Sequence, residues 1–190
     1  GGRVAAPAPG LAPLPANGDL TAAEVGLMQS IQRERRLREV LAGLGPTYEF
    51  IIIDCPPSLN MLTVNALVAA QGVLIPIQCE YYALEGLSAL LDTIAQIRAS
   101  RNPSLAIEGI LRTMHDPRNN LANQVSTQLV THFNAEVYRT IIPRNVRLAE
   151  APSHGQPVLL YDKSSRGSIA YLALASEVIR RQQKRQVATV

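Results

Sequence analysis

Short, mainly apolar runs of residues alternate with helical patterns over most of the chain. The apolar runs predict strands at 48–53, 73–77, 107–114 and 137–142. The stretches between and after them predict helices near 59–70, 83–100, 121–133 and 167–183. Continuous apolar strands are typical of a parallel sheet covered on both faces, because a strand with one solvent face alternates polar with apolar residues. We therefore expect an α/β fold: a doubly wound, mostly parallel sheet with helices on both faces.

The amino-terminal part follows a different pattern. Residues 1–18 contain four prolines and four glycines, a composition that resists regular structure, so we expect an irregular terminus over 1–13. Asp19 and the spacing of Thr21 and Glu24 indicate a helix start, and a second helix is expected over 33–44. One domain over 14–185 and a short tail over 186–190 complete the expected organisation.

Composition narrows the choice of protein class. With 190 residues, 47% of them hydrophobic, the chain can bury one sizeable core. No apolar run approaches the roughly 18 to 20 residues of a membrane-spanning helix, and we expect a cytoplasmic protein. The net charge of +3 permits an anionic partner without requiring one. Cys55 and Cys79 adjoin predicted strands, so reduced packing thiols are favoured over a disulfide.

The predicted strand over 50–53 ends in Asp54, and the carboxyl ends of parallel strands are where ligands bind. Pro56 and Pro57 stop the strand, and Ser58 is a candidate cap for the following helix. An apolar strand that ends in aspartate is similar to a Walker B element, whose carboxylate holds Mg²⁺ directly or through a water molecule. By itself the same pattern also fits an ordinary strand end.

Longer motifs decide between these readings. They are, in chain order, the strings PANGDLTAAE at 15–24, DCPPSL at 54–59 with NAL at 65–67, PIQCEYYALEGL at 76–87, TMHDPR at 113–118 and IPRNVRLAEAPSHG at 142–155. Together they resemble the ParA/Soj-type chromosome-partitioning ATPases, deviant Walker proteins of the MinD/ParA superfamily. The resemblance extends over about 14–181 and implies a P-loop NTPase-like fold related to AAA domains.

The family resemblance implies a set of ligands and partners. ATP and Mg²⁺ are the implied cofactors, with Asp54 on the metal side and the adenine surrounded by residues Met114, Pro143, Arg144 and Asn145. A homodimer, non-specific DNA and a ParB-type centromere-binding protein are the implied partners, and the implied location is the nucleoid. Arg118 and Arg147 match family positions for DNA binding, and the planar guanidinium of arginine is suited to this role because it can pair with two phosphate oxygens.

Each of these residues also has an ordinary structural interpretation. Pro143 ends a predicted strand, and an exposed arginine most often only solvates a surface. The arginines at 33, 35, 36 and 38 either add a second basic patch or solvate a helix. His115, His132 and His154 lack the short, fixed spacing of zinc ligands and are interpreted as structural or surface residues.

The sequence departs from the family in one respect. Its only lysines, Lys163 and Lys184, lie outside any glycine-rich loop, whereas a phosphate loop needs a lysine that reaches the β- and γ-phosphates. The resemblance implies that the first strand and this loop precede the matching segment, so we predict no catalytic residue within these 190 residues and interpret the chain as a fragment.

Two other functions remain open. One is a non-catalytic module that binds DNA or a partner and has lost ATP binding. The other is a MinD-like membrane ATPase, which is disfavoured because the basic stretch 180–190 has no large apolar side chains to enter a membrane.

Overall fold

The computed structural model describes residues 12–13, 25–27, 31–44, 48–56 and 58–188. These residues divide into two units. The first unit contains residue 12, 74–86 and 108–188, and the second contains 87–107 together with the described residues from 13 to 73.

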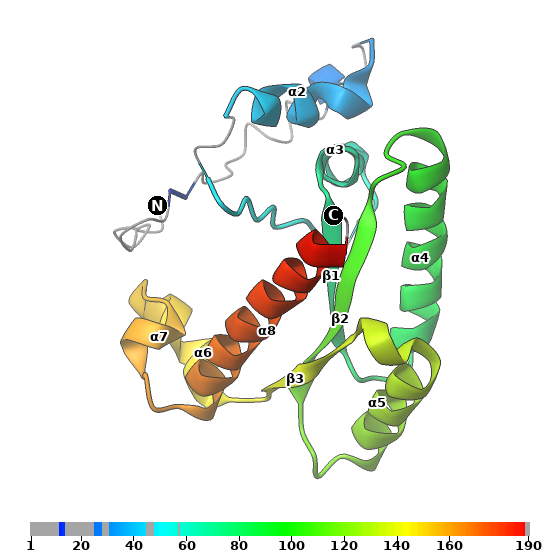
Figure 1. The fold of residues 1–190 in the computed structure, drawn as a ribbon. Helices are drawn as coiled ribbons and strands as arrows, with labels where there is room; N and C mark the ends of the chain where they lie inside the picture. The colour runs from blue at the N-terminus through cyan, green and yellow to red at the C-terminus, as the bar shows by residue number, and fades with distance from the viewer. Residues whose placement is uncertain (1–11, 14–24, 28–30, 45–47, 57, 189–190) are drawn as a thin grey trace. The chain divides into compact units, whose positions relative to one another are not determined.

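A three-stranded sheet forms the centre of the first unit. Its strands are β1 (Gly72–Gln78), β2 (Ala106–His115) and β3 (Val137–Pro143), in the order β1-β2-β3 (Figure 1). β2 and β3 are parallel, with Ile110 opposite Val137 and His115 opposite Pro143. The three strands predicted after residue 70 are therefore confirmed, because each has an apolar run long enough to cross a buried sheet.

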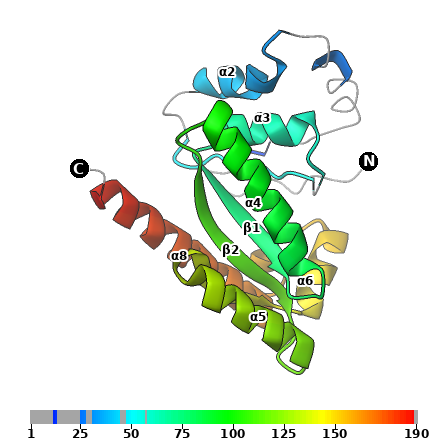
Figure 2. The same ribbon diagram turned by 90° about the vertical axis from the view of Figure 1, so that its right-hand side faces the viewer.

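Helices lie on both faces of this sheet. α8 (Arg166–Ala188) packs on one face and α5 (Asn120–Phe133) on the other (Figure 2). Neighbouring residues of β2 point to opposite faces: Leu111 joins a core with Tyr138, Ile142 and Leu174 of α8, whereas Arg112 reaches α5. The predicted fold class, a parallel sheet covered on both sides, is confirmed.

The first unit also contains short helices that the apolar pattern did not predict. They are α6 (Val146–Glu150), η4 (Ala151–His154) and α7 (Val158–Tyr161). Each is one turn or slightly longer, which is too short for helical periodicity to be visible in the sequence. The cap residues Asn145 and Pro157 mark where two of them begin.

The second unit is helical. It contains η1 (Arg33–Arg35), α2 (Arg36–Ala42), α3 (Met61–Ala69) and most of α4 (Ala83–Ser100). The buried amide of Asn65 on α3 donates to the backbone oxygen of Arg33 (2.9 Å) and accepts from the backbone N–H of Leu37 (3.2 Å). One side chain thus satisfies backbone groups of two other helices, which fixes α3 against them.

Two local predictions in this unit are wrong. Residues 48–56 form neither helix nor strand, although 48–53 have a strand-like apolar run. Ile52 is 92% exposed, and Phe50 and Ile51 are about half exposed. A strand exists only where a neighbour completes its backbone hydrogen bonds, and an apolar run does not reveal whether that neighbour is present.

The second wrong prediction is the cap of α3. Asn60 caps this helix by accepting from the backbone N–H of Thr63 at 3.0 Å, and Ser58 instead supplies a backbone oxygen to the Thr63 hydroxyl. The prediction of a helix starting at Asp19 lies outside the described residues, although 25–27 are helical.

Candidate functional site

The end of β2 carries the first group of candidate residues. On β2, Arg112 and His115 are three residues apart, whereas their partners on β3 are only two apart, so β2 contains a bulge between them. Met114 lies in this bulge with a φ of 51°, and its side chain is 49% exposed. A left-handed backbone is uncommon for methionine, and bulges often occur next to functional sites, where they redirect a side chain.

The end of β3 lies directly beside this bulge. The backbone N–H of Arg144 donates to the backbone oxygen of His115 at 3.0 Å, which joins the two loops. Asn145 uses its side-chain oxygen to accept from the backbone N–H of Arg147 at 3.0 Å, and it thereby caps α6. The structure therefore brings the four candidate adenine residues to one edge of the sheet, at the carboxyl ends of neighbouring parallel strands.

The four residues offer different chemistry at that edge. Met114 presents an exposed thioether, and Arg144 presents an exposed guanidinium. Pro143 ends β3, and Asn145 turns the chain into α6. His115 has a buried Nε2 atom with no hydrogen-bond partner among the described residues, a feature that its position in the sequence did not indicate.

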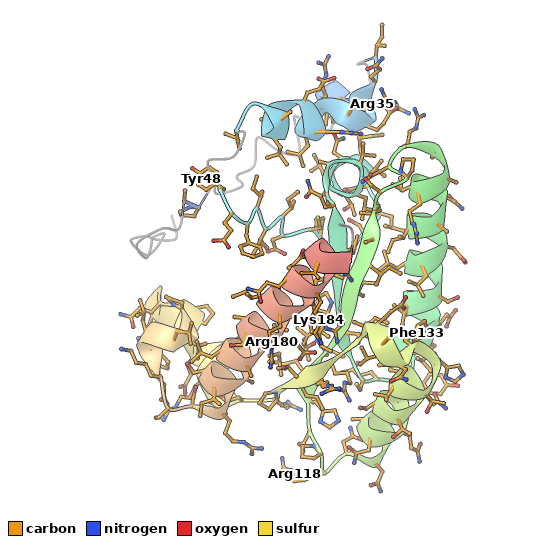
Figure 3. The ribbon with its side chains drawn as sticks, in the orientation of Figure 1. Arg35, Tyr48, Arg118, Phe133, Arg180 and Lys184 are labelled. Atoms are coloured by element: carbon orange, nitrogen blue, oxygen red, sulfur yellow. The ribbon has the colours of Figure 1, made fainter. Side chains whose placement is uncertain are left out.

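Arg118 lies at the tip of the loop between β2 and α5 (Figure 3), and its side chain is 88% exposed. Its Nε and one terminal nitrogen donate to the two carboxylate oxygens of Asp116, at 3.0 and 2.8 Å. The backbone N–H of Arg118 also donates to Asp116, at 3.0 Å. These hydrogen bonds from Arg118 hold the pKa of Asp116 well below its usual range, so the carboxylate is charged at neutral pH.

Arg147, the other candidate DNA-binding residue, lies on α6. It donates to Glu150 at 2.7 Å and lies 3.5 Å from a carboxylate oxygen of Asp162. The Tyr161 hydroxyl donates to the same Glu150 oxygen at 3.2 Å. The hydrogen bond from Arg147 is the main cause that lowers the pKa of Glu150.

Asp54, the candidate metal ligand, belongs to the second unit. It is exposed and follows the non-strand segment, so its predicted position at the end of a buried strand is wrong. Within the described ranges, no three side chains of the His, Cys, Asp and Glu types gather as a metal-binding group. A role for Asp54 in holding Mg²⁺ therefore remains a prediction based on its carboxylate and on its motif.

The basic residues near 33–38 are partly engaged. Arg36 pairs with Glu39 at 3.2 Å, and Glu34 pairs with Arg101 at 2.8 Å. A second basic patch at this place stays a prediction.

The two cysteines differ in exposure. Cys79 is buried, as expected for a packing thiol, and burial raises its pKa although nearby Arg112 partly lowers it. Cys55 is exposed, contrary to that expectation, because the segment before it is not a buried strand.

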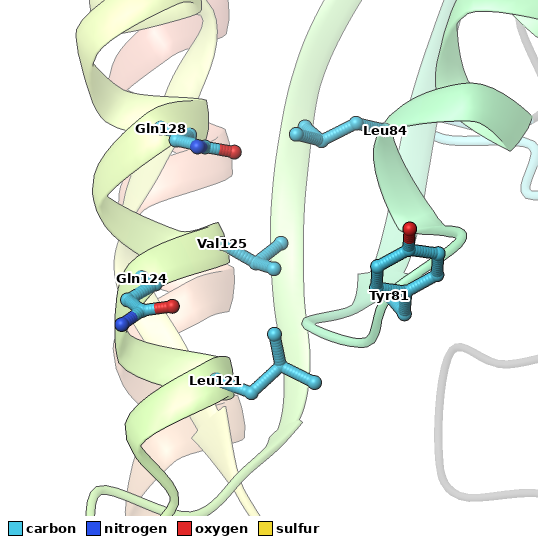
Figure 4. A pocket seen from close by; sticks show the side chains of 6 residues that line it. All are labelled: Tyr81, Leu84, Leu121, Gln124, Val125 and Gln128. Carbon is cyan, nitrogen blue, oxygen red and sulfur yellow. The ribbon is translucent and has the colours of Figure 1, made fainter.

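A cavity of about 180 Å³ lies in the first unit, between α5 and the segment that leads into α4 (Figure 4). It is lined by side chains from α5, from the start of α4 and from the turn before α4, namely Tyr81, Leu84, Leu121, Gln124, Val125 and Gln128. It is smaller than the roughly 300 to 1,000 Å³ usual for ligand pockets and contains no charged group.

None of the helices in the described part of the chain is long and apolar enough to span a bilayer.

Comparisons with known proteins agree with the sequence motifs. A family model described as an AAA domain matches residues 5–107. The chain is 63% identical to a Pseudomonas putida protein over 90% of its length and 52% identical to the chromosome partitioning protein ParA of Caulobacter vibrioides over 94%. It spans only 65% of the Pseudomonas protein and 67% of the Caulobacter protein.

A solved structure supports the same relationship. It is the crystal structure of cobyrinic acid a,c-diamide synthase from Mycobacterium smegmatis with a bound ATP analogue and magnesium. Its TM-score is 0.73 at 35% identity, over 90% of this chain and 62% of the solved chain.

Proposed function

This chain belongs to the ParA/Soj family of chromosome-partitioning ATPases, and from that premise we propose that it serves as an ATP-dependent, dimerising switch that binds DNA without sequence preference. In this proposal a ParB-type partner stimulates hydrolysis, and the protein acts in the cytoplasm on the nucleoid. The observation that carries the proposal is the hydrogen bond between Arg144 and His115. It holds Met114 and the loop 143–145 together at the edge of the sheet where α/β proteins bind ligands.

The chemistry of these loops suits a nucleotide. An exposed thioether can pack against a flat base, and an exposed guanidinium can approach either the base or a phosphate. The relative with a bound ATP analogue and magnesium supports the same ligand class for this chain. Asp54 offers the exposed carboxylate oxygens that Mg²⁺ prefers, and the bound ion would neutralise phosphate charge.

The first prediction concerns ATP hydrolysis. The 190-residue chain is expected to hydrolyse Mg²⁺-ATP no faster than background, because Lys163 lies in a turn and Lys184 lies on α8 rather than in a phosphate loop. A phosphate-release assay measures this. Turnover that Asp54→Ala abolishes would contradict the prediction.

The role of Asp54 is tested in an extended protein, in which the phosphate-loop segment typical of the family precedes the chain. There, Asp54→Ala is expected to lower Mg²⁺-dependent turnover by about tenfold to a hundredfold, the range seen when support of a catalytic metal is lost. Asp92→Asn, an exposed charge change on α4, is the control. Unchanged turnover in Asp54→Ala would mean that Asp54 does not help to hold the catalytic Mg²⁺.

DNA binding gives the second prediction. In the extended protein, Arg118→Ala and Arg147→Ala are each expected to weaken binding about threefold to tenfold, equally on unrelated duplexes, because phosphate contacts carry no base information. Each lost contact should reduce the log–log salt slope by about 0.9. Fluorescence anisotropy over a salt series measures both quantities, with exposed Arg98→Ala as the matched control.

A change in sequence preference with an unaltered salt slope would argue against phosphate contacts. The competing function is a non-catalytic module that binds DNA or a partner without ATP. Equal DNA affinity with and without ATP in the extended protein would support that module over the switch.

A further inference from the structure

Each of the two candidate DNA-binding arginines already has a carboxylate partner. Asp116 accepts hydrogen bonds from Nε and from a terminal nitrogen of Arg118, one on each carboxylate oxygen. This parallel, two-bond geometry is also how a guanidinium binds two oxygens of a phosphate. The carboxylate therefore occupies the two-donor edge of the Arg118 guanidinium, which is the edge that a phosphate would use.

Arg147 is engaged by acidic residues of two segments, through one hydrogen bond to Glu150 and an ion pair with Asp162. Glu150 accepts from it one turn later on α6, and Asp162 approaches it from the turn after α7. Tyr161 donates to the same Glu150 oxygen and so helps to hold Glu150 in place. Both arginines are at least half exposed, so DNA can reach them.

From these contacts we infer that Asp116 and Glu150 are intramolecular competitors of DNA phosphates for Arg118 and Arg147. This inference rests on the proposed DNA binding and adds a form of regulation to it. DNA binds by replacing a carboxylate with a phosphate on each arginine. The carboxylate that is released stays close to the phosphate and repels it, so the chain's own acidic residues limit its affinity for DNA.

The size of the effect follows from the exposure of the pairs. Ion pairs at a surface are weak, so a phosphate can displace the carboxylate without a large conformational change. Removing one carboxylate should therefore strengthen DNA binding by about twofold to fivefold. This gain in DNA affinity must depend on the paired arginine, because without the arginine the carboxylate and the phosphate no longer compete for a common partner.

Asp116→Asn is the sharpest test. Asparagine keeps the side-chain oxygen that accepts the backbone N–H of Arg118 and so preserves the turn, while it removes the charge and the two-bond pairing. In the extended protein with ATP and Mg²⁺, binding to a short duplex should become about twofold to fivefold tighter. Asp92→Asn changes the net charge equally on α4 and should have a smaller effect.

A double-mutant cycle completes the experiment. With Arg118→Ala as background, Asp116→Asn should leave DNA affinity almost unchanged. Glu150→Gln, with Arg147→Ala as its background, provides a second and independent cycle.

The outcomes separate the inference from the proposed function. If Asp116→Asn and Glu150→Gln strengthen binding no more than Asp92→Asn does, or equally with and without their arginines, the competition is refuted. The proposed DNA contacts survive that result if Arg118→Ala and Arg147→Ala still weaken binding. If neither arginine substitution weakens binding, the proposed DNA site fails and the inference fails with it.

Discussion

Glu177→Gln is expected to lower the free energy of unfolding by about 3 kcal/mol, because this carboxylate of α8 satisfies backbone groups of β3. One of its oxygens accepts the N–H of Arg139 and the other accepts the N–H of Thr140, both at 2.9 Å. The Thr140 hydroxyl and Arg181 also donate to it, at 2.7 and 3.0 Å. β3 is the last strand in the order of the described sheet, so Glu177 takes the place of a neighbouring strand.

The pH dependence of stability provides a second measurement of the same contact. Burial raises the pKa of Glu177, but the hydrogen bonds from Arg139, Thr140 and Arg181 outweigh it and lower the pKa to about 2. The folded pKa thus lies below the unfolded value, so this contribution is fully present above about pH 4.5 and is lost as the pH falls towards 2.

Chemical denaturation of wild type and Glu177→Gln at several pH values measures both effects. The difference between the two proteins should shrink below about pH 4.5. Asp92→Asn, with the same change in charge, is expected to alter stability by less than about 0.5 kcal/mol. A Glu177→Gln protein as stable as wild type at pH 7 would show that the carboxylate does not hold β3.

Gly109→Ala is expected to cost about 2 to 5 kcal/mol of stability, from steric overlap together with backbone strain. Gly109 lies in β2 with a φ of 157°, where its backbone closely approaches β3. An added Cβ would lie 2.5 Å from Cε2 of Tyr138 and 2.8 Å from the backbone oxygen of Glu136. The Tyr138 ring cannot easily move, because it is fully buried and Arg181 stacks on it at 4.1 Å from the ring centre.

Gly86→Ala is the matched control for this substitution. Gly86 is exposed on α4, and an added Cβ would meet no atom within 4 Å. Alanine there should leave stability unchanged or raise it by up to about 1 kcal/mol, because alanine favours helix more than glycine does. Equal thermal melting of Gly109→Ala and wild type would mean that the two strands can separate to admit the methyl group.

The parts of the fold that the sequence predicts well are those whose signal is local. β1, β2 and β3 have mainly apolar sequences, and α4 and α5 begin and end within two residues of the predicted bounds. Family membership was likewise readable from motifs and is confirmed by the comparisons. The sequence is sufficient for these elements because the spacing of apolar residues determines both which side chains are buried and whether the segment forms a strand or a helix.

The candidate site was predictable as a set of residues but not as an arrangement. The motifs name Met114 and the loop 143–145, yet the bulge in β2 and the hydrogen bond from Arg144 to His115 depend on the register between two strands. The carboxylate partners of the two arginines also differ in how far the sequence alone could predict them. Asp116 is two residues from Arg118, whereas Asp162 reaches Arg147 from 15 residues away only because the chain folds back after α7.

The sequence by itself determined the class of fold, its principal strands and helices, and the residues that carry the family chemistry. Tertiary structure alone decided that 48–53 is not a strand, that Glu177 holds the edge of β3, and that Asp162 approaches Arg147 from beyond α7. The physical reason is that hydrogen bonds and ion pairs need a partner in space. An apolar run indicates which side chains a segment can bury. Only the folded chain brings the hydrogen-bonding and charged partners next to that segment.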